Sequence, residues 1–163
     1  MYVENKQTGK KCNVRVEKIG SKDFSIIRRS KKFDFDWNKY KGEDIYKLCL
    51  DETGEILGLM HVIDHPDPCY DVLEINVIEI SKDNRGENGF GRIGGCLLAY
   101  AVLLSQEYHH DGYLVLTAKN KKASLFHSKY GFQYIGKIGG VMGERMVSDT
   151  ANSIELVKEY ADK

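Results

Sequence analysis

The spacing of hydrophobic residues in the first half of the chain predicts strands joined by turns. Apolar and polar residues alternate over residues 12–19, which predicts a first strand. Two apolar runs, residues 44–50 and 56–63, flank the turn Asp51-Glu52-Thr53-Gly54 and predict a hairpin.

Two segments around that hairpin have no such alternation. Residues 24–41 show no clear period, and we expect there only one short helical turn, over residues 36–40. The segment His65-Pro66-Asp67-Pro68 predicts a loop, because a proline has no N–H to donate to a strand ladder.

The second half of the chain alternates strands with helices. Over residues 72–81 the apolar residues occupy one phase up to Val77 and the other phase at Ile78 and Ile80, the pattern of a strand with a β-bulge. From Phe90 the period becomes helical, with one apolar face; its positions are Ile93, Leu97, Ala101, Leu104 and Tyr108.

The last elements continue this alternation. The expected elements are a strand over residues 112–118, a helix over 120–130 with Ala123, Phe126 and Tyr130 inward, strands over 132–138 and 141–147, and a final helix. Ser148 or Asp149 is expected to cap the final helix, whose apolar positions are Ile154, Val157 and Ala161. This order predicts a mixed α/β sheet in a single domain, residues 1–163.

Composition and charge narrow the function classes. The chain has 163 residues and zero net charge, and no apolar stretch is long enough to span a bilayer. Its four cysteines are scattered and the first residues are polar, so we expect reduced thiols and a cytoplasmic protein. Residues 1–41 carry twelve Lys/Arg and five Asp/Glu, whereas residues 43–79 carry ten acids and one lysine. An acidic segment attracts cationic amines.

Histidines and acids in the acidic segment raise the possibility of a metal site. His61 and His65 lie near Asp64, Asp67 and Cys69, but their spacing matches no usual zinc frame. The sequence therefore predicts no metal.

A glycine-rich loop follows the strand over residues 72–81 and leads into the long helix. Glycines let the backbone approach a ligand, and the helix N-terminus adds positive potential, so the loop suits a pyrophosphate. Residues 89–94 also fit the dinucleotide pattern GxGxxG. That alternative requires an acidic residue after the next strand, and the next strand ends Thr117-Ala118-Lys119 with none.

A second segment, residues 120–132, carries a motif that can be read together with the glycine-rich loop. Asn120, Ala123, Phe126, Gly131 and Phe132 stand in the register found in the GNAT acetyltransferases, and Arg85-Gly86 stands where that family has Arg/Gln-Gly. The chain thus resembles the GNAT family over about residues 72–138. Its glycine-rich loop is longer than the usual family loop, and a histidine, His127, replaces the family's tyrosine.

The resemblance implies the acyl-CoA N-acyltransferase fold, with a mixed central sheet, a β-bulge strand, flanking helices and an abbreviated N-terminal helical region. It implies acetyl-CoA as co-substrate and transfer of its acetyl group to a primary amine. The implied cofactor-binding residues are Ile78, Glu79, Ile80, Arg85, Gly86, Gly89, Gly91, Gly94, Asn120 and Phe126.

The implied catalytic residues are Glu74 and His127. Glu74 stands where the histone-acetyltransferase branch has its base, with Glu79 as an alternative base, and His127 stands at the position of the acid. Structural interpretations remain open for each: Glu74 as a solvent-facing strand residue, His127 as a packing residue, and Asn120 as a helix cap.

The resemblance leaves the acceptor open between a small molecule and a protein amine. The alternative function is a non-catalytic acyl-CoA-binding or assembly module on the same fold. A homo-oligomer is compatible with the short N-terminal helical region, and no membrane partner is expected. The absence of a recognition motif in the basic arm argues against nucleic acid as a partner.

Overall fold

The computed structural model describes residues 1–137 and 143–161. The chain is a mixed α/β fold that divides into two compact units. The first unit consists of Met1–His61 and Val77–Leu97, and the second consists of Val62–Asn76 and the chain from Leu98 onward.

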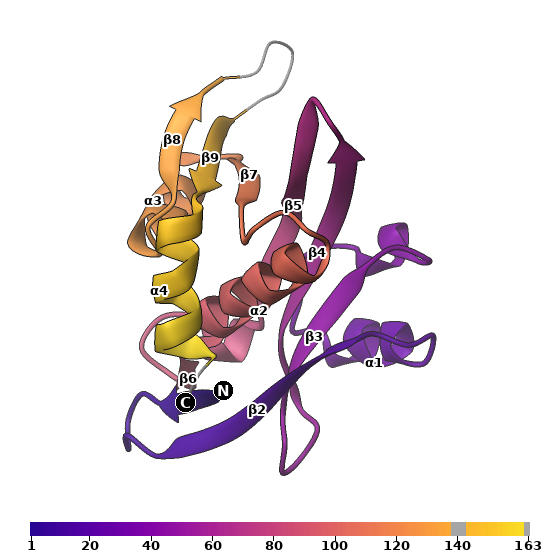
Figure 1. Ribbon diagram of the computed structural model, residues 1–163. Coiled ribbons are helices and arrows are strands. Elements are labelled where there is room, and N and C mark those ends of the chain that lie inside the picture. Colours follow the sequence, from indigo (N-terminus) through magenta and orange to yellow (C-terminus); the bar gives the residue numbers. More distant parts are fainter. Residues whose placement is uncertain (138–142, 162–163) are drawn as a thin grey trace. The chain divides into compact units, whose positions relative to one another are not determined.

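The first unit is built on antiparallel strands. These are β1 (Tyr2–Asn5), β2 (Lys11–Lys18), β3 (Ile45–Leu50), the start of β4 (Ile56–Asp67), and β6 (Phe90–Gly91). They run in the order β6-β1-β2-β3-β4 (Figure 1). The register pairs Val14 with Leu50 and Ile45 with His61. These pairings place alternate apolar residues of β2 and β3 on the buried face.

Two short helical elements cover part of this sheet. They are α1 (Asp23–Ser30) and the 3₁₀ turn η1 (Trp37–Tyr40). Phe24 and Ile27 of α1 and Trp37 of η1 are buried in one apolar cluster with residues of the strands. The other buried members of the cluster are Ile45, Cys49, Ile56, Leu59 and Val77.

The second unit contains the parallel pair of strands. β5 (Tyr70–Ile80) runs parallel to β7 (Leu114–Ala118), with Glu74 opposite Val115. β7 pairs antiparallel with β9 (Glu144–Ser148), and β9 pairs with β8 (Gln133–Gly136). Parallel neighbours need a crossover connection, and here it contains α2 (Ile93–Glu107).

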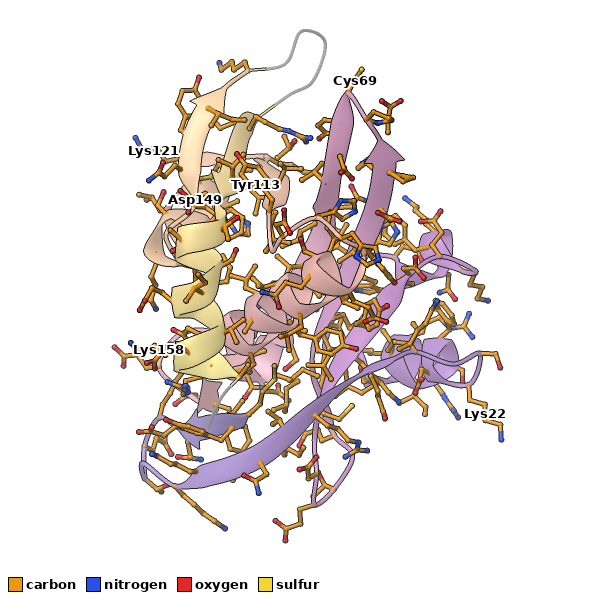
Figure 2. The ribbon with its side chains drawn as sticks, viewed as in Figure 1. Lys22, Cys69, Tyr113, Lys121, Asp149 and Lys158 are labelled. Carbon is orange, nitrogen blue, oxygen red and sulfur yellow. The ribbon has the colours of Figure 1, made fainter. Side chains whose placement is uncertain are left out.

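The remaining helices follow the strands of this unit. α3 (Lys121–Lys129) contacts β7 and α4 (Thr150–Tyr160) contacts β9. The tip of the β4–β5 hairpin carries the exposed Cys69 (Figure 2). Of the helices in the described residues, none has the length and apolar character needed to cross a membrane.

The first turn of α2 is fully buried, so its sequence is apolar on all sides. Residues 93–99 are all buried. Gly58 of β4 makes this packing possible, because a Cβ there would lie 2.8 Å from Ile93 Cγ2 and 3.0 Å from Leu97 Cδ1. The strand and the helix therefore approach more closely than a side chain on β4 would permit.

Several expected elements are confirmed, among them the first strand, the hairpin, the long helix and the helix capped by Asp149. Two expectations were wrong, and two short strands were not predicted. Residues 23–30 form α1, although only a turn was expected at 36–40; the prediction missed α1 because its buried positions are few. β4 continues through Pro66, where the strand is exposed and the missing donor costs little. β1 and β6 are too short to show alternation.

Side-chain burial corrects the expected inward faces of two helices. In α4 the buried residues are Ser153 and Leu156, and Ile154 is 55% exposed. In α3 the buried residue is His127. Residues 138 and 141–142 of the two expected closing strands lie outside the described residues.

The phase change in the apolar residues of β5 arises because a charged residue, Glu79, takes one of the buried positions. Leu73, Ile75, Val77 and Glu79 are all buried, whereas Ile78 and Ile80 are only partly buried. A charged residue therefore occupies a core position of the strand at Glu79.

Candidate functional site

The glycine-rich loop of the first unit is closed by one buried asparagine. The short 3₁₀ turn η2 (Lys82–Asn84) follows β5 directly. The Asn84 Oδ1 atom accepts a hydrogen bond from the Phe90 amide at 2.7 Å, and its Nδ2 donates to Ser81 Oγ at 2.7 Å. Asn84 thus ties Ser81, the residue after β5, to Phe90 of β6.

The carbonyl groups of this loop are held by a lysine from the N-terminal hairpin. Lys6 Nζ donates to the carbonyl oxygens of Asn84 (2.8 Å), Gly86 (2.8 Å) and Asn88 (3.1 Å). Within residues 1–137 and 143–161, the amides of residues 86–89 have no hydrogen-bond acceptor. Consecutive free amides before a helix N-terminus form the kind of site that binds phosphate groups.

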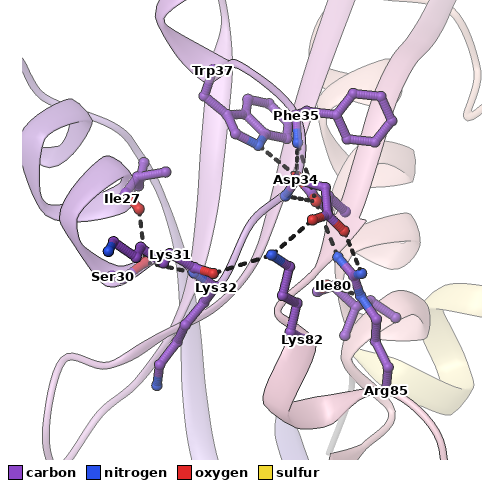
Figure 3. Close-up of polar contacts among 11 residues, drawn as sticks. Ile27, Ser30, Lys31, Lys32, Asp34, Phe35, Trp37, Ile80, Lys82 and Arg85 are labelled. Atoms are coloured by element: carbon purple, nitrogen blue, oxygen red, sulfur yellow. Dashed lines mark hydrogen bonds and ion pairs between the residues drawn. The ribbon is translucent and has the colours of Figure 1, made fainter.

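Arg85 is directed away from such an anion. Its guanidinium donates to Asp34 Oδ2 at 2.7 Å, to Glu79 Oε1 at 3.0 Å and to the Ile80 carbonyl at 2.8 Å (Figure 3). Hydrogen bonds from Arg85 and Lys82 hold the pKa of the Asp34 carboxyl below its usual range. The Arg85 side chain was expected to bind the cofactor, and in this structure it instead fixes the segment before η1.

Glu79 has a structural role in this unit, and its contacts do not favour its expected function as an alternative base. It is 5% exposed and accepts hydrogen bonds from the Asp34 amide (2.5 Å) and from Trp37 Nε1 (2.8 Å), besides the bond from Arg85 (Figure 3). A buried carboxylate with both oxygens occupied by hydrogen bonds is poorly placed to meet an amine substrate. The backbone of Ile78, Glu79 and Ile80 remains as the expected cofactor contact.

Glu74 lies on the other face of β5, in a polar cluster of the second unit. Arg145 Nη1 of β9 donates to Glu74 Oε2 at 3.0 Å and to Thr117 Oγ1 at 3.1 Å. His65 Nε2 lies 3.7 Å from the same Glu74 oxygen. Burial lowers the pKa of the Arg145 guanidinium. Glu74 is therefore neither simply solvent-facing nor free; it is a half-buried ion-paired carboxylate.

His127 is buried among aromatic rings on α3. Its ring centroid lies 5.1 Å from that of Phe126 and 5.7 Å from that of Phe132, both in edge contacts. Desolvation lowers the pKa of His127 to about 4, so the imidazole is neutral at pH 7. The expected role of His127 as a proton-donating imidazolium near neutral pH therefore conflicts with its environment.

Asn120 caps a helix, as one interpretation of the sequence allowed, and two glycines of the loop have positive φ. The Asn120 side chain accepts a hydrogen bond from the Ala123 amide at 2.9 Å and caps α3. Gly86 and Gly89 have φ of 71° and 72°, in the left-handed region that favours glycine. Gly91 is in β6, and Gly94 lies in the buried first turn of α2.

Sequence reasoning missed Lys6, Asn84 and Arg145. Each acts on residues distant in the chain or through a buried amide, and no local motif marks such contacts. His65 was considered only as a metal ligand. No group of three metal-ligating side chains occurs in the described part of the chain.

Comparisons with known proteins match the chain to solved structures only. No family model and no curated protein matches it. An acetyltransferase of the GNAT family from Listeria monocytogenes is 15% identical, with a TM-score of 0.58, over 91% of this chain and 99% of that one. AtaTR bound with AcCoA is 17% identical, with a TM-score of 0.57, over 88% and 98%.

A third structure is AtaT complexed with acetyl-methionyl-tRNAfMet. It is 17% identical to this chain, with a TM-score of 0.55, over 90% of this chain and 99% of that one. The matches cover nearly the whole of each solved structure. The chain has the fold of the GNAT acetyltransferases.

Proposed function

We propose that this protein transfers the acetyl group of acetyl-CoA to a primary amine. The observation that carries the proposal is the loop over residues 84–90, whose carbonyls are bound by Lys6 and whose amides at residues 86–89 are free. This arrangement, at the start of a helix, suits the pyrophosphate of acetyl-CoA. The fold, with structures such as AtaTR bound with AcCoA among its matches, supports the same co-substrate.

The residues that would hold the co-substrate belong mainly to the backbone. The amides of residues 86–89 would receive the pyrophosphate, and the backbone at Ile78, Glu79 and Ile80 would face the acyl arm. The Arg85 side chain is not among them, because it is bound by Asp34 and Glu79. Acetyl-CoA supplies the activated acetyl group, and the polar cluster around Glu74 supplies the groups that handle the proton of the amine.

The acceptor class is wider than the sequence indicated. The AtaT complex contains an acetylated aminoacyl-tRNA, and the basic residues 1–41 could contact phosphates, so nucleic acid carrying an amine belongs among the candidates. The earlier argument against nucleic acid as a partner has no support in the structural matches.

The test is release of free thiol from acetyl-CoA in the presence of defined amines. The panel contains spermidine, lysine, a peptide with a free amino terminus, and methionyl-tRNA, each with a no-amine control. We expect thiol release with at least one amine, with the acetylated product identified by mass. Binding of acetyl-CoA without release in any arm would favour the non-catalytic acyl-CoA-binding module instead.

A further inference from the structure

The polar cluster around Glu74 contains a histidine that the function so far leaves unused. His65 comes from β4, Glu74 from β5 and Arg145 from β9, all within the second unit. The negative charge of Glu74 is matched by Arg145, whose side chain is only 10% exposed. A carboxylate so paired is poorly suited to take a second positive partner, a proton, from a substrate.

His65 has the geometry of an oriented base. Its Nε2 is buried and has no hydrogen-bond partner in the part of the chain that the structure describes, and it faces Glu74 Oε2 at 3.7 Å. The side chain is nevertheless 30% exposed, which leaves Nδ1 as the ring nitrogen that a substrate could reach. The edge of the ring also contacts Tyr70, with centroids 4.9 Å apart.

The neighbouring carboxylate selects the tautomer of this ring. A carboxylate beside Nε2 favours the form with hydrogen on Nε2, and the lone pair is then on Nδ1. The distance of 3.7 Å exceeds a hydrogen bond, but such contacts commonly shorten when substrate binds. A lone pair on Nδ1 is the site at which an imidazole takes up a proton.

We propose that His65 is the general base of the acetyl transfer, with Glu74 and Arg145 as its positioning residues. This assignment rests on the proposed function. The ammonium form of the acceptor gives one proton to His65 Nδ1 and becomes a neutral amine. The amine nitrogen then forms a bond to the acetyl carbon, the carbon–sulfur bond breaks, and the thiolate leaves with the electron pair. The second proton lost by the nitrogen neutralises the thiolate, and the imidazolium returns its proton to solvent.

The charge around His65 fits a cationic acceptor. Asp64 and Asp71 of the same hairpin are tied to His110, each with an oxygen 2.6 Å from a ring nitrogen, and Asp67 is exposed. These acids raise the local concentration of ammonium groups near the base.

The first experiment measures the His65 tautomer without any turnover. Nitrogen-15 NMR of the full chain, assigned with His65→Gln, should show hydrogen on Nε2 at pH 8, and Glu74→Gln should reduce that preference. A hydrogen on Nδ1, or a tautomer that ignores Glu74→Gln, would overturn the assignment.

The second experiment uses the amine from the panel that gives the fastest thiol release. His65→Gln should lower kcat about a hundredfold or more and remove the acid limb of kcat/KM, while acetyl-CoA affinity is unchanged. Glu74→Gln should lose about tenfold and move that limb to lower pH, because the imidazolium loses its negative neighbour. The exposed His109 provides the control variant, His109→Asn, which should keep rate and limb.

The competing assignment, Glu74 as the base itself, predicts the reverse order. A silent His65→Gln beside an inactive Glu74→Gln would refute the role of His65 and leave the acetyl transfer intact. If the unsubstituted protein binds acetyl-CoA yet acetylates no amine of the panel, the proposed function fails and this assignment fails with it.

Discussion

At the scale of a residue, two glutamates of β5 differ in burial and in contacts because their side chains lie on opposite faces of the strand. Glu74 and Glu79 are separated by an odd number of positions on β5, so their side chains lie on opposite faces. Glu79 is enclosed by the Asp34 amide, Trp37 and Arg85, whereas Glu74 is 19% exposed in its side chain and faces His65. Of the two carboxylates, Glu74 is the more exposed.

Burial gives His127 a pH signature in folding. Its pKa is about 4 in the folded chain, and in the unfolded chain it should lie near the ordinary 6.5. Between these values the unfolded state binds more protons, so the folded state loses stability as pH falls from about 6.5 to about 4. The full shift corresponds to about 3 kcal/mol.

We therefore expect His127→Phe to be less sensitive to acid than the unsubstituted protein. Urea unfolding at about pH 7 and about pH 4.5 measures the loss of stability in each. The exposed His109 supplies the control, since His109→Asn should keep the full acid dependence. An unchanged acid dependence in His127→Phe would show that the ring is not buried in its neutral form.

At the scale of elements, the loop between β5 and α2 is shaped by contacts rather than by glycine content. Asn84 closes it, Lys6 binds its carbonyls, and Gly89 sits against the backbone of η2. Gly86, by contrast, has open space around it although its φ is nearly the same. Substitutions at these two glycines therefore distinguish the cost of backbone strain from the cost of a steric clash.

Gly89→Ala should be far more disruptive than Gly86→Ala. A Cβ at Gly89 would lie 2.4 Å from Asn84 Oδ1 and 2.5 Å from the Asp83 carbonyl, so η2 must move and the Phe90 bond must break. Gly86→Ala should cost only the left-handed strain, about 1–2 kcal/mol. Urea unfolding of both variants, with acetyl-CoA titration by calorimetry, measures this; equal stabilities would show that the loop tolerates the close contact.

At the scale of the whole molecule, ligand binding should appear as stability of the entire fold. If the loop over residues 84–90 holds acetyl-CoA as proposed, a concentration about 100 times the dissociation constant adds roughly 2.7 kcal/mol to the free energy of unfolding. Acetyl-CoA should therefore raise the melting temperature, and NADH, which tests the dinucleotide alternative, should not. A melting temperature that millimolar acetyl-CoA leaves unchanged would argue against the cofactor assignment.

The sequence by itself determined the order of most elements and the fold class. The period of the hydrophobic residues depends only on neighbouring positions. It therefore predicted the strands around Val14 and Leu48 and the helix that starts near Ile93, and the residue type at Asp149 predicted the cap. The glycine-rich loop and the register from Asn120 to Phe132 were readable for the same reason, and they pointed to the fold that the solved structures match.

Only the tertiary structure decided which of the candidate side chains are available. Arg85 and Glu79 are bound by Asp34 and Trp37, which precede them by more than 40 residues. His127 is neutral because its surroundings exclude water, and Glu74 faces Arg145 across 71 positions of sequence. Desolvation and ion pairing depend on neighbours that the chain brings together only by folding, so no local pattern could have revealed them.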